Sequence, residues 1–241
     1  MAMNRFEPSV TAHDSPHEEP APTARSLIES AYRQLRMDII SGRHPAGEKL
    51  RVEHLKETYG VGGSTLREAL ALLVSDSLVV PQAQRGFRVS PMSLADIEDL
   101  TRTRTLLECA AFQDAMKYGD ERWEAEVVGA YHRLSRAQER LAREKDGWSS
   151  EWEDRNRAFH QALISACPSR WILRFQSVLY GQTERYWRLS TATTPVAASV
   201  HEEHRQIFDA AMKRDGKAGA RLLAQHIQHS LTVIKGRGVP K

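Results

Sequence analysis

The sequence predicts a mainly α-helical protein: an N-terminal winged helix-turn-helix with a small β-hairpin, then a C-terminal all-α bundle of about six helices. Apolar residues recur at steps of three and four along most of the chain. That period is interrupted between residues 78 and 89, where two short β-prone runs enclose a turn. We expect a disordered tail at 1–24, a DNA-binding domain at 25–91 and an all-α domain at 94–236.

Composition narrows the classes of protein that remain. The chain has 241 residues, of which 41% are hydrophobic and 27% charged, as in soluble globular proteins. No apolar run reaches the roughly 18 residues of a membrane span, so we expect no membrane partner. Cys109 and Cys167 are too few for a disulfide framework and suit a reducing cytoplasm. A net charge of +3 does not by itself indicate nucleic-acid binding.

The first 24 residues are rich in proline and carry an acidic patch at 14–19, with little that could be buried. They read as a loose tail or as a segment that docks on a partner. From Ser26 to Ile40 the apolar spacing is helical, and Gly42 and Pro45 end that helix. A short helix at 52–59 follows.

The stretch from Gly62 predicts a recognition helix. Gly62 and Gly63 break the preceding helix, and Ser64 or Thr65 is placed to cap the next one. Arg67 then points outward, opposite the buried leucine face. Short hydroxyl groups and an arginine at a helix N-terminus suit a DNA major groove. An ordinary surface helix with a good cap is the alternative.

Two β-prone runs at 78–80 and 87–89 follow, joined by a turn that ends in Arg85-Gly86. This hairpin is the wing. Arg85 at its tip suits a phosphate or a minor groove, or is simply a solvated loop charge.

These segments together resemble the DNA-binding domain of GntR-type bacterial transcription regulators over roughly residues 26–90. The resemblance is carried by P-A-G-E-K-L at 45–50, L-R-E-A-L at 66–70 and R-G-F-R-V at 85–89. The family usually has Ser-Arg where this chain has Gly62 and Gly63, so one base-reading arginine is missing. The DNA contacts we expect are Arg51, Ser64, Thr65, Arg67, Arg85 and Gly86.

Beyond residue 93 the pattern predicts helices only, separated by glycines and prolines. The expected helices are 94–118, 120–145, 149–166, 170–190, 197–214 and 217–235.

Three of these helices carry polar residues within their apolar faces. They are Asn156 and His160 in the third, His204 in the fifth and His226 in the sixth. A buried imidazole or amide without a partner costs about 1–3 kcal/mol. Each histidine can bond a carbonyl or carboxylate separately, or the three can converge on a divalent metal. Three nitrogens and one oxygen suit zinc, with nickel or manganese as alternatives.

This half is similar to the effector-binding domain of the FadR-type branch of the same family. The similarity is carried by N-R-A-F-H at 156–160, H-R-Q-I-F-D-A-A at 204–211 and His226. It implies a metal held by Asn156, His160, His204 and His226, where the usual residue at 156 is Asp.

It also implies that Arg104, within the first helix of the bundle, contacts a carboxylate effector. An ordinary ion pair with Glu108, four residues on, is the alternative. Arg185 and Arg188 are weaker effector candidates.

The function expected is that of a cytoplasmic, nucleoid-associated DNA-binding regulator and not of an enzyme. A homodimer would bind a palindromic operator, and a small carboxylate would control it, most often by relieving repression. The opening of the recognition helix is similar to regulators of short dicarboxylate catabolism, which favours a C4–C6 dicarboxylate. The alternatives are a DNA-binding dimer with a purely structural bundle and a metal-dependent hydrolase; for the latter no general base is evident.

Overall fold

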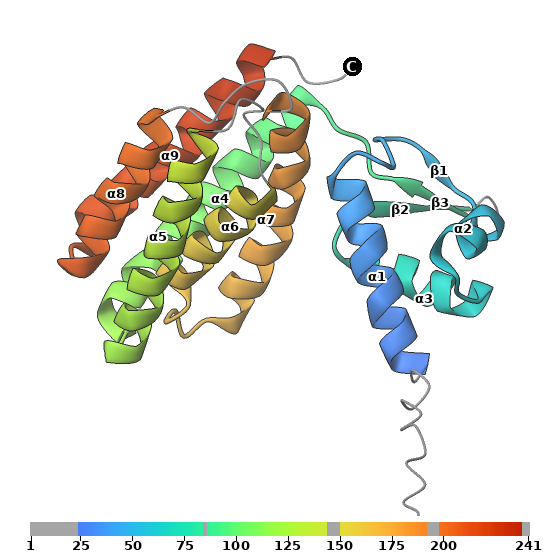
Figure 1. The fold of residues 1–241 in the computed structure, drawn as a ribbon, viewed down its shortest axis with the longest axis horizontal. Coiled ribbons are helices and arrows are strands. Elements are labelled where there is room, and N and C mark those ends of the chain that lie inside the picture. The colour runs from blue at the N-terminus through green and yellow to red at the C-terminus, as the bar shows by residue number, and fades with distance from the viewer. Residues whose placement is uncertain (1–23, 84–85, 144–149, 192–197, 238–241) are drawn as a thin grey trace, which may run out of the picture.

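The computed structural model describes residues 24–83, 86–143, 150–191 and 198–237. They form a winged-helix unit and a helical bundle, joined by the extended segment before α4 (Figure 1). Each unit has its own apolar core, one formed by residues between 31 and 89 and the main bundle core by residues between 111 and 227. No helix in these ranges is both long and apolar enough to cross a bilayer.

Three helices build the first unit: α1 Ala24–Ile40, α2 Val52–Tyr59 and α3 Gly63–Ser75. Leu35 of α1 and the α3 leucines Leu66 and Leu70 are completely buried. Gly60 ends α2 in the left-handed conformation at φ 63°, and its N–H bonds back to Lys56. The tight turn after Gly60 brings α3 against both α1 and α2, which confirms the expected helix-turn-helix.

An antiparallel sheet completes this unit, with β2 Val79–Gln82 and β3 Gly86–Val89 forming the expected hairpin. A third strand, β1 Lys49–Leu50, pairs on the other side of β3 and gives the order β1-β3-β2. The sequence reading did not include β1, because two residues are too few to show a period of two.

The second unit is the predicted bundle. Its six helices are α4 Leu94–Tyr118, α5 Glu121–Leu141, α6 Ser150–Ile164, α7 Arg170–Thr191, α8 Ala198–Met212 and α9 Gly216–Arg237. Side chains cap four of them: Ser93 accepts from the Asp96 N–H, Asp120 from the Trp123 N–H, Ser169 from the Ile172 N–H, and Asp215 from the Ala218 N–H. Phe112, Phe159 and Ile207 fill the middle of the bundle without exposure.

Helix α7 lies on the side of the bundle that faces the winged-helix unit, and it contacts α1 of that unit (Figure 1). Gln182 of α7 donates to the Asp76 carbonyl at 2.7 Å, and Arg185 donates to the Ser90 carbonyl at 2.6 Å. Gly181 of α7 lies beside Arg36 of α1, whose Nη2 would be 2.7 Å from a Cβ at that position. The two units therefore meet through specific contacts as well as through the connecting segment.

Candidate functional site

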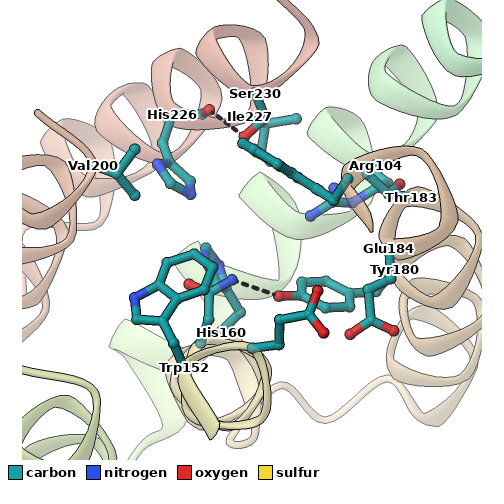
Figure 2. A pocket seen from close by; sticks show the side chains of 13 residues that line it. Arg104, Trp152, His160, Tyr180, Thr183, Glu184, Val200, His226, Ile227 and Ser230 are labelled. Carbon is teal, nitrogen blue, oxygen red and sulfur yellow. Dashed lines mark hydrogen bonds between the residues drawn. The ribbon is translucent and has the colours of Figure 1, made fainter. Parts of the chain in front are cut away.

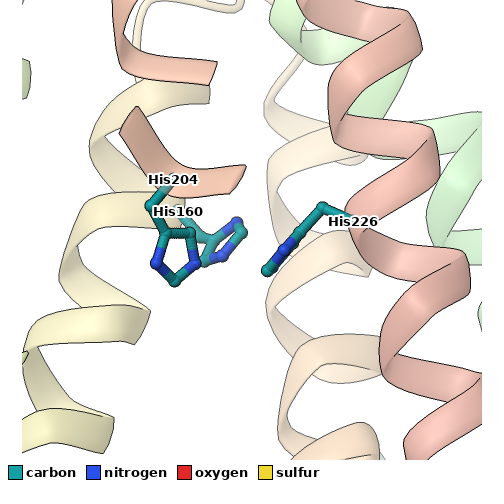
Figure 3. Close-up of side chains that lie close together, drawn as sticks. All are labelled: His160, His204 and His226. Atoms are coloured by element: carbon teal, nitrogen blue, oxygen red, sulfur yellow. The ribbon is translucent and has the colours of Figure 1, made fainter. Parts of the chain in front are cut away.

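Three histidines from three helices meet inside the bundle. His160 of α6, His204 of α8 and His226 of α9 are at most 7% exposed. Each offers one ring nitrogen such that all three nitrogens lie within 4.8 Å of one another. Figure 3 shows the rings converging across the gap between their helices. This spacing matches three ligands around one metal ion.

Several polar atoms at this cluster have no hydrogen-bond partner among the described residues. These atoms are Nδ1 and Nε2 of His204 and Oδ1 of Asn156. The Asn156 amide is oriented by its Nδ2 group, which donates to the Tyr180 hydroxyl at 2.9 Å. Leaving such atoms buried and unpaired costs about 1–3 kcal/mol each, so the arrangement fits a bound cation that takes a lone pair from one His204 nitrogen and one from Asn156 Oδ1.

Burial lowers the pKa of His160 and His204 well below the ordinary value, and the neighbouring imidazoles add to the shift. The two rings are therefore neutral at physiological pH. A neutral imidazole has the nitrogen lone pair that a metal ligand needs.

Glu203 orients the third histidine from outside the cluster. Its carboxylate accepts from His226 Nδ1 at 2.7 Å and from His229 Nδ1 at 2.5 Å. Burial alone would raise the pKa of Glu203, but the two histidine contacts hold the pKa below its ordinary value. The hydrogen bond fixes the proton of His226 on Nδ1 and leaves Nε2 free for a metal. The sequence reading missed Glu203 and assigned His229 no role; the acidic residue just before His204 was the available signal.

A cavity that is partly open to solvent adjoins the cluster. Figure 2 shows side chains of α4, α6, α7, α8 and α9 pointing into it. Of the expected metal ligands, Asn156, His160 and His226 line it. Its other lining residues are Arg104, Trp152, Glu153, Tyr180, Thr183, Glu184, Trp187, Val200, Ile227 and Ser230. A concave site lined by aromatic and apolar groups with a few polar ones suits a small-molecule ligand.

Arg104 forms the ion pair with Glu108 that was the alternative to an effector contact, and it also lines the cavity. Its Nε donates to the Glu108 carboxylate at 2.8 Å, but this ion pair is buried and not on the helix surface. The guanidinium also lies 4.9 Å from the centre of the Tyr180 ring and lines the cavity. Because Glu108 is reached through Nε, that contact leaves the two terminal Nη groups for other acceptors.

The two weaker arginine candidates lie elsewhere. Arg185 does not line the cavity: its guanidinium bonds Gln182 Oε1 at 3.0 Å and the Ser90 carbonyl at 2.6 Å. The expectation that Arg185 contacts the effector is therefore wrong, because that side of α7 faces the winged-helix unit. Arg188 pairs with Glu153 at 2.5 Å and is not a lining residue.

The expected DNA contacts of the helix-turn-helix lie around the start of α2 and α3. Arg51, Ser64 and Arg67 are exposed, and Thr65 is half-buried. The capping prediction is wrong: α3 begins at Gly63 with Gly62 as its N-cap, and no side chain caps it. Helix geometry starts one residue before Ser64, so the free N–H groups of the first turn are not covered by a side chain.

At the wing, Gly86 is exposed and has φ +86°, a conformation that favours glycine. Its neighbour Arg85 and the expected tail lie outside the described residues, apart from Ala24, which begins α1.

Two family models match the chain. Residues 27–89 match the model described as "Bacterial regulatory proteins, gntR family", and residues 99–229 match the FCD domain. The first match covers the winged-helix unit, and the second contains the histidine cluster and the cavity.

Similar proteins agree with these matches. The HTH-type transcriptional regulator BphR of Paraburkholderia xenovorans is 49% identical over 220 residues, covering 91% of this chain and 90% of that protein. The HTH-type transcriptional repressor GlaR of Escherichia coli is 33% identical over 208 residues, covering 85% and 94%. Among solved structures, Escherichia coli McbR/YncC superposes with a TM-score of 0.73 at 21% identity, covering 88% of this chain and 98% of that one. A GntR regulator from a Rhodococcus species gives 0.71 at 22% identity, covering 90% and 100%. The two structures support the fold.

Proposed function

The chain belongs to the GntR family of bacterial DNA-binding transcription regulators and carries an FCD domain, and from this premise we propose how it is controlled. A small carboxylate binds beside a metal ion in the FCD domain and changes the affinity of the winged helix for its operator. The working division is a DNA-binding domain at 25–91 and an effector-binding and dimerisation domain at 94–236.

The metal ligands are Asn156, His160, His204 and His226. The support is the convergence of three imidazole nitrogens within 4.8 Å and the unpartnered Oδ1 of Asn156 on the same side of the bundle. FCD domains commonly bind a metal. Zinc suits the three nitrogens best, and nickel or manganese also accept this ligand set. When bound, the ion supplies a positive centre for carboxylate oxygens.

Arg104 holds the carboxylate from the opposite side. Its guanidinium is buried at the cavity wall, and the Glu108 contact keeps its charge compensated while no ligand is bound. A buried guanidinium binds a carboxylate through paired N–H groups, which favours an acid over a neutral ligand.

The operator is contacted by Arg51, Ser64, Thr65 and Arg67 at the helix-turn-helix, and by Arg85 and Gly86 at the wing. A homodimer would place two such surfaces on a palindrome, with half-sites one helical turn apart or a multiple of it. Because Gly62 and Gly63 carry no side chain that can read bases, DNA shape contributes more to specificity. Repression relieved by the effector, in the cytoplasm at the nucleoid, is the mode we propose.

Helix α7 connects effector binding in the bundle with operator binding by the winged-helix unit. Tyr180, Glu184 and Trp187 line the cavity, while Gln182 and Arg185 bond the winged-helix unit. A ligand that shifts α7 therefore shifts the DNA-binding unit as well.

The observation that carries this proposal is the placement of the histidine cluster at the edge of a cavity that also contains Arg104. The test uses full-length protein and an operator selected from random duplex DNA. Metal-loaded protein should lose operator affinity when small carboxylates are added, and chelator-treated protein should not respond. An equal response with and without metal would contradict the role of the metal.

One alternative remains, a bundle that only dimerises. Elemental analysis of purified, metal-supplemented protein separates it from the proposal, because a purely structural bundle would hold no ion. The family and its relatives are transcription regulators and not enzymes, so the hydrolase alternative is set aside.

A further inference from the structure

Charge is unevenly distributed along the effector cavity, and this distribution bears on the kind of acid that binds. The inference drawn from it rests on the proposed function. Of the described lining residues, Arg104 is the one arginine, and no lysine is present. It lies near His160, so Arg104 and the proposed metal would place positive charge at one end of the cavity. The acidic lining residues are Glu153 and Glu184.

Both glutamates are already paired with arginines that do not line the cavity. Glu153 lies 2.5 Å from Arg188, and Glu184 lies 2.5 Å from Arg157. A ligand with a second carboxylate would bring it close to two acidic side chains whose cations are engaged. Like charges at a partly desolvated site are unfavourable, so this wall disfavours a diacid.

The same region of the cavity offers apolar and aromatic surface. Trp152 of α6 and Trp187 of α7 line it together with the aliphatic Val200 and Ile227. The Trp152 indole N–H donates to Gln138 Oε1 at 2.6 Å, so its polar edge is engaged within the protein. Both indoles line the cavity, and an aromatic lining suits a flat apolar group.

Helix geometry separates this aromatic end from the metal end. Trp152, Asn156 and His160 follow one another at steps of four, or about 6 Å along α6 per step. Tyr180 and Trp187 are seven residues apart, or about 10 Å along α7. The metal and the indoles are thus roughly one to two helical turns apart, which gives room for a carboxylate, a short linker and a ring.

We infer that the effector of this regulator is a monocarboxylate with a flat apolar body, such as an arylalkanoic acid. Its carboxylate lies between the metal and Arg104, and its ring lies against Trp152 and Trp187. This class differs from the C4–C6 dicarboxylate that the start of the recognition helix favours. Trp187 and Glu153 become the residues that determine specificity.

The first experiment compares two acids by calorimetry on metal-loaded, full-length protein. The probes are 4-phenylbutyrate and adipate, which share a carboxylate on three methylenes; this segment ends in a phenyl ring in the first and in a CH2–carboxylate group in the second. We expect phenylbutyrate to bind roughly ten-fold or more tightly than adipate, from burial of the ring. Trp187→Leu should remove most of this preference, and Trp171→Ala should not, because Trp171 is exposed and outside the cavity.

The second variant reverses the preference by charge. Glu153→Gln keeps the shape of the side chain and removes one of the two acidic groups that line the cavity. Adipate should gain roughly ten-fold in affinity, since its second carboxylate then meets one acidic neighbour fewer. Phenylbutyrate should change little.

The outcomes distinguish this inference from the proposed function. Adipate binding as tightly as phenylbutyrate, or a Trp187→Leu variant with unchanged preference, would overturn the inference and leave carboxylate control intact. Failure of both acids to bind protein that contains its metal would count against carboxylate control itself.

Discussion

Arg185 of α7 donates a hydrogen bond of 2.6 Å to the backbone carbonyl of Ser90, at the end of the wing. The guanidinium is buried, and a second bond ties it to Gln182, which itself donates to the Asp76 carbonyl after α3. Two carbonyls of the DNA-binding unit are thereby held by neighbouring residues of a helix that also lines the cavity.

The first prediction concerns this contact. Arg185→Ala should weaken the transmission of the effector signal, because it leaves the Ser90 carbonyl unpaired at a cost of about 1–3 kcal/mol. Metal content and carboxylate affinity should stay within about two-fold of wild type, since the side chain is outside the cavity. Operator titrations with and without effector measure the response. Arg174→Ala, which removes an exposed arginine of the same helix, is the matched control.

The second prediction concerns DNA. Arg67→Ala should lower operator affinity by about 1–3 kcal/mol, roughly 5- to 150-fold, and leave the thermal unfolding midpoint unchanged. Arg67 is exposed beside Gly63, with Nη1 3.5 Å from where a Cβ of Gly63 would lie. Gel-shift titrations at fixed salt measure it, with the exposed Arg122→Ala on α5 as a charge-matched control. Equal affinity of Arg67→Ala and wild type would remove Arg67 from the interface.

The third prediction concerns the metal. His204→Ala should reduce bound metal from one ion per chain and lower the unfolding midpoint, because metal binding adds to the free energy of folding. Native mass spectrometry and calorimetry measure both. Loss of a fully buried ring also leaves a cavity, so the comparison is repeated in chelator, where the metal contribution to the difference should vanish.

Two further variants test the metal site, one as a control and one that should tighten metal binding. His132→Ala removes an exposed histidine of α5 and should leave the metal content unchanged. Asn156→Asp supplies a negative ligand and should tighten metal binding, since the uncharged amide contributes less attraction for a cation. Unaltered metal content in His204→Ala would contradict the site.

The fourth prediction concerns the residue that orients His226. Glu203→Gln should weaken metal affinity by about 10- to 100-fold, as loss of such outer partners typically does. Competition with a chromogenic chelator measures the affinity. The neighbouring Glu202→Gln is the control, because Glu202 is exposed and pairs with Arg205. Equal losses in the two variants would show a general charge effect.

The fifth prediction concerns pH. Burial raises the pKa of Glu153 from 4.5 to about 7, although Arg188 acts in the opposite direction. Between these two values the folded chain retains a proton that the unfolded chain has lost, so this group makes the free energy of unfolding fall as pH rises. In metal-free protein, Glu153→Gln should therefore gain stability over wild type between about pH 5 and about pH 7. Urea unfolding at constant ionic strength measures the difference; a difference independent of pH would contradict the shift.

Much of the fold could be predicted because it depends on local pattern. The helical period gave α4 over the same residues as the structure, and the glycine and proline breaks separated the other bundle helices to within a few residues. Strand β1 was not predicted, and the start of α3 was misplaced. The first is fixed by pairing with β3, and the second by backbone geometry at Gly62, and neither leaves a clear signal in side-chain pattern.

Part of the candidate site could be predicted from local pattern, and part could not. His160, His204 and His226 could be predicted because polar residues on apolar helix faces need partners, and the structure brings them together. The contacts of Glu203 and Arg185 could not, because their partners lie 23 and 95 positions away in the chain, although Glu203 directly precedes His204 in the sequence. Periodicity within a helix says which side of it is apolar, but not which neighbour a polar side chain on the other side will meet.

The position of α7 between the cavity and the winged-helix unit has a thermodynamic consequence for the operator. If effector binding changes operator affinity through this helix, linkage requires operator DNA to change effector affinity by the same factor. DNA-bound copies of the regulator would then sense the acid at a different concentration from free copies. The operator would then be an allosteric ligand of the regulator, coupled to the effector site through a single helix.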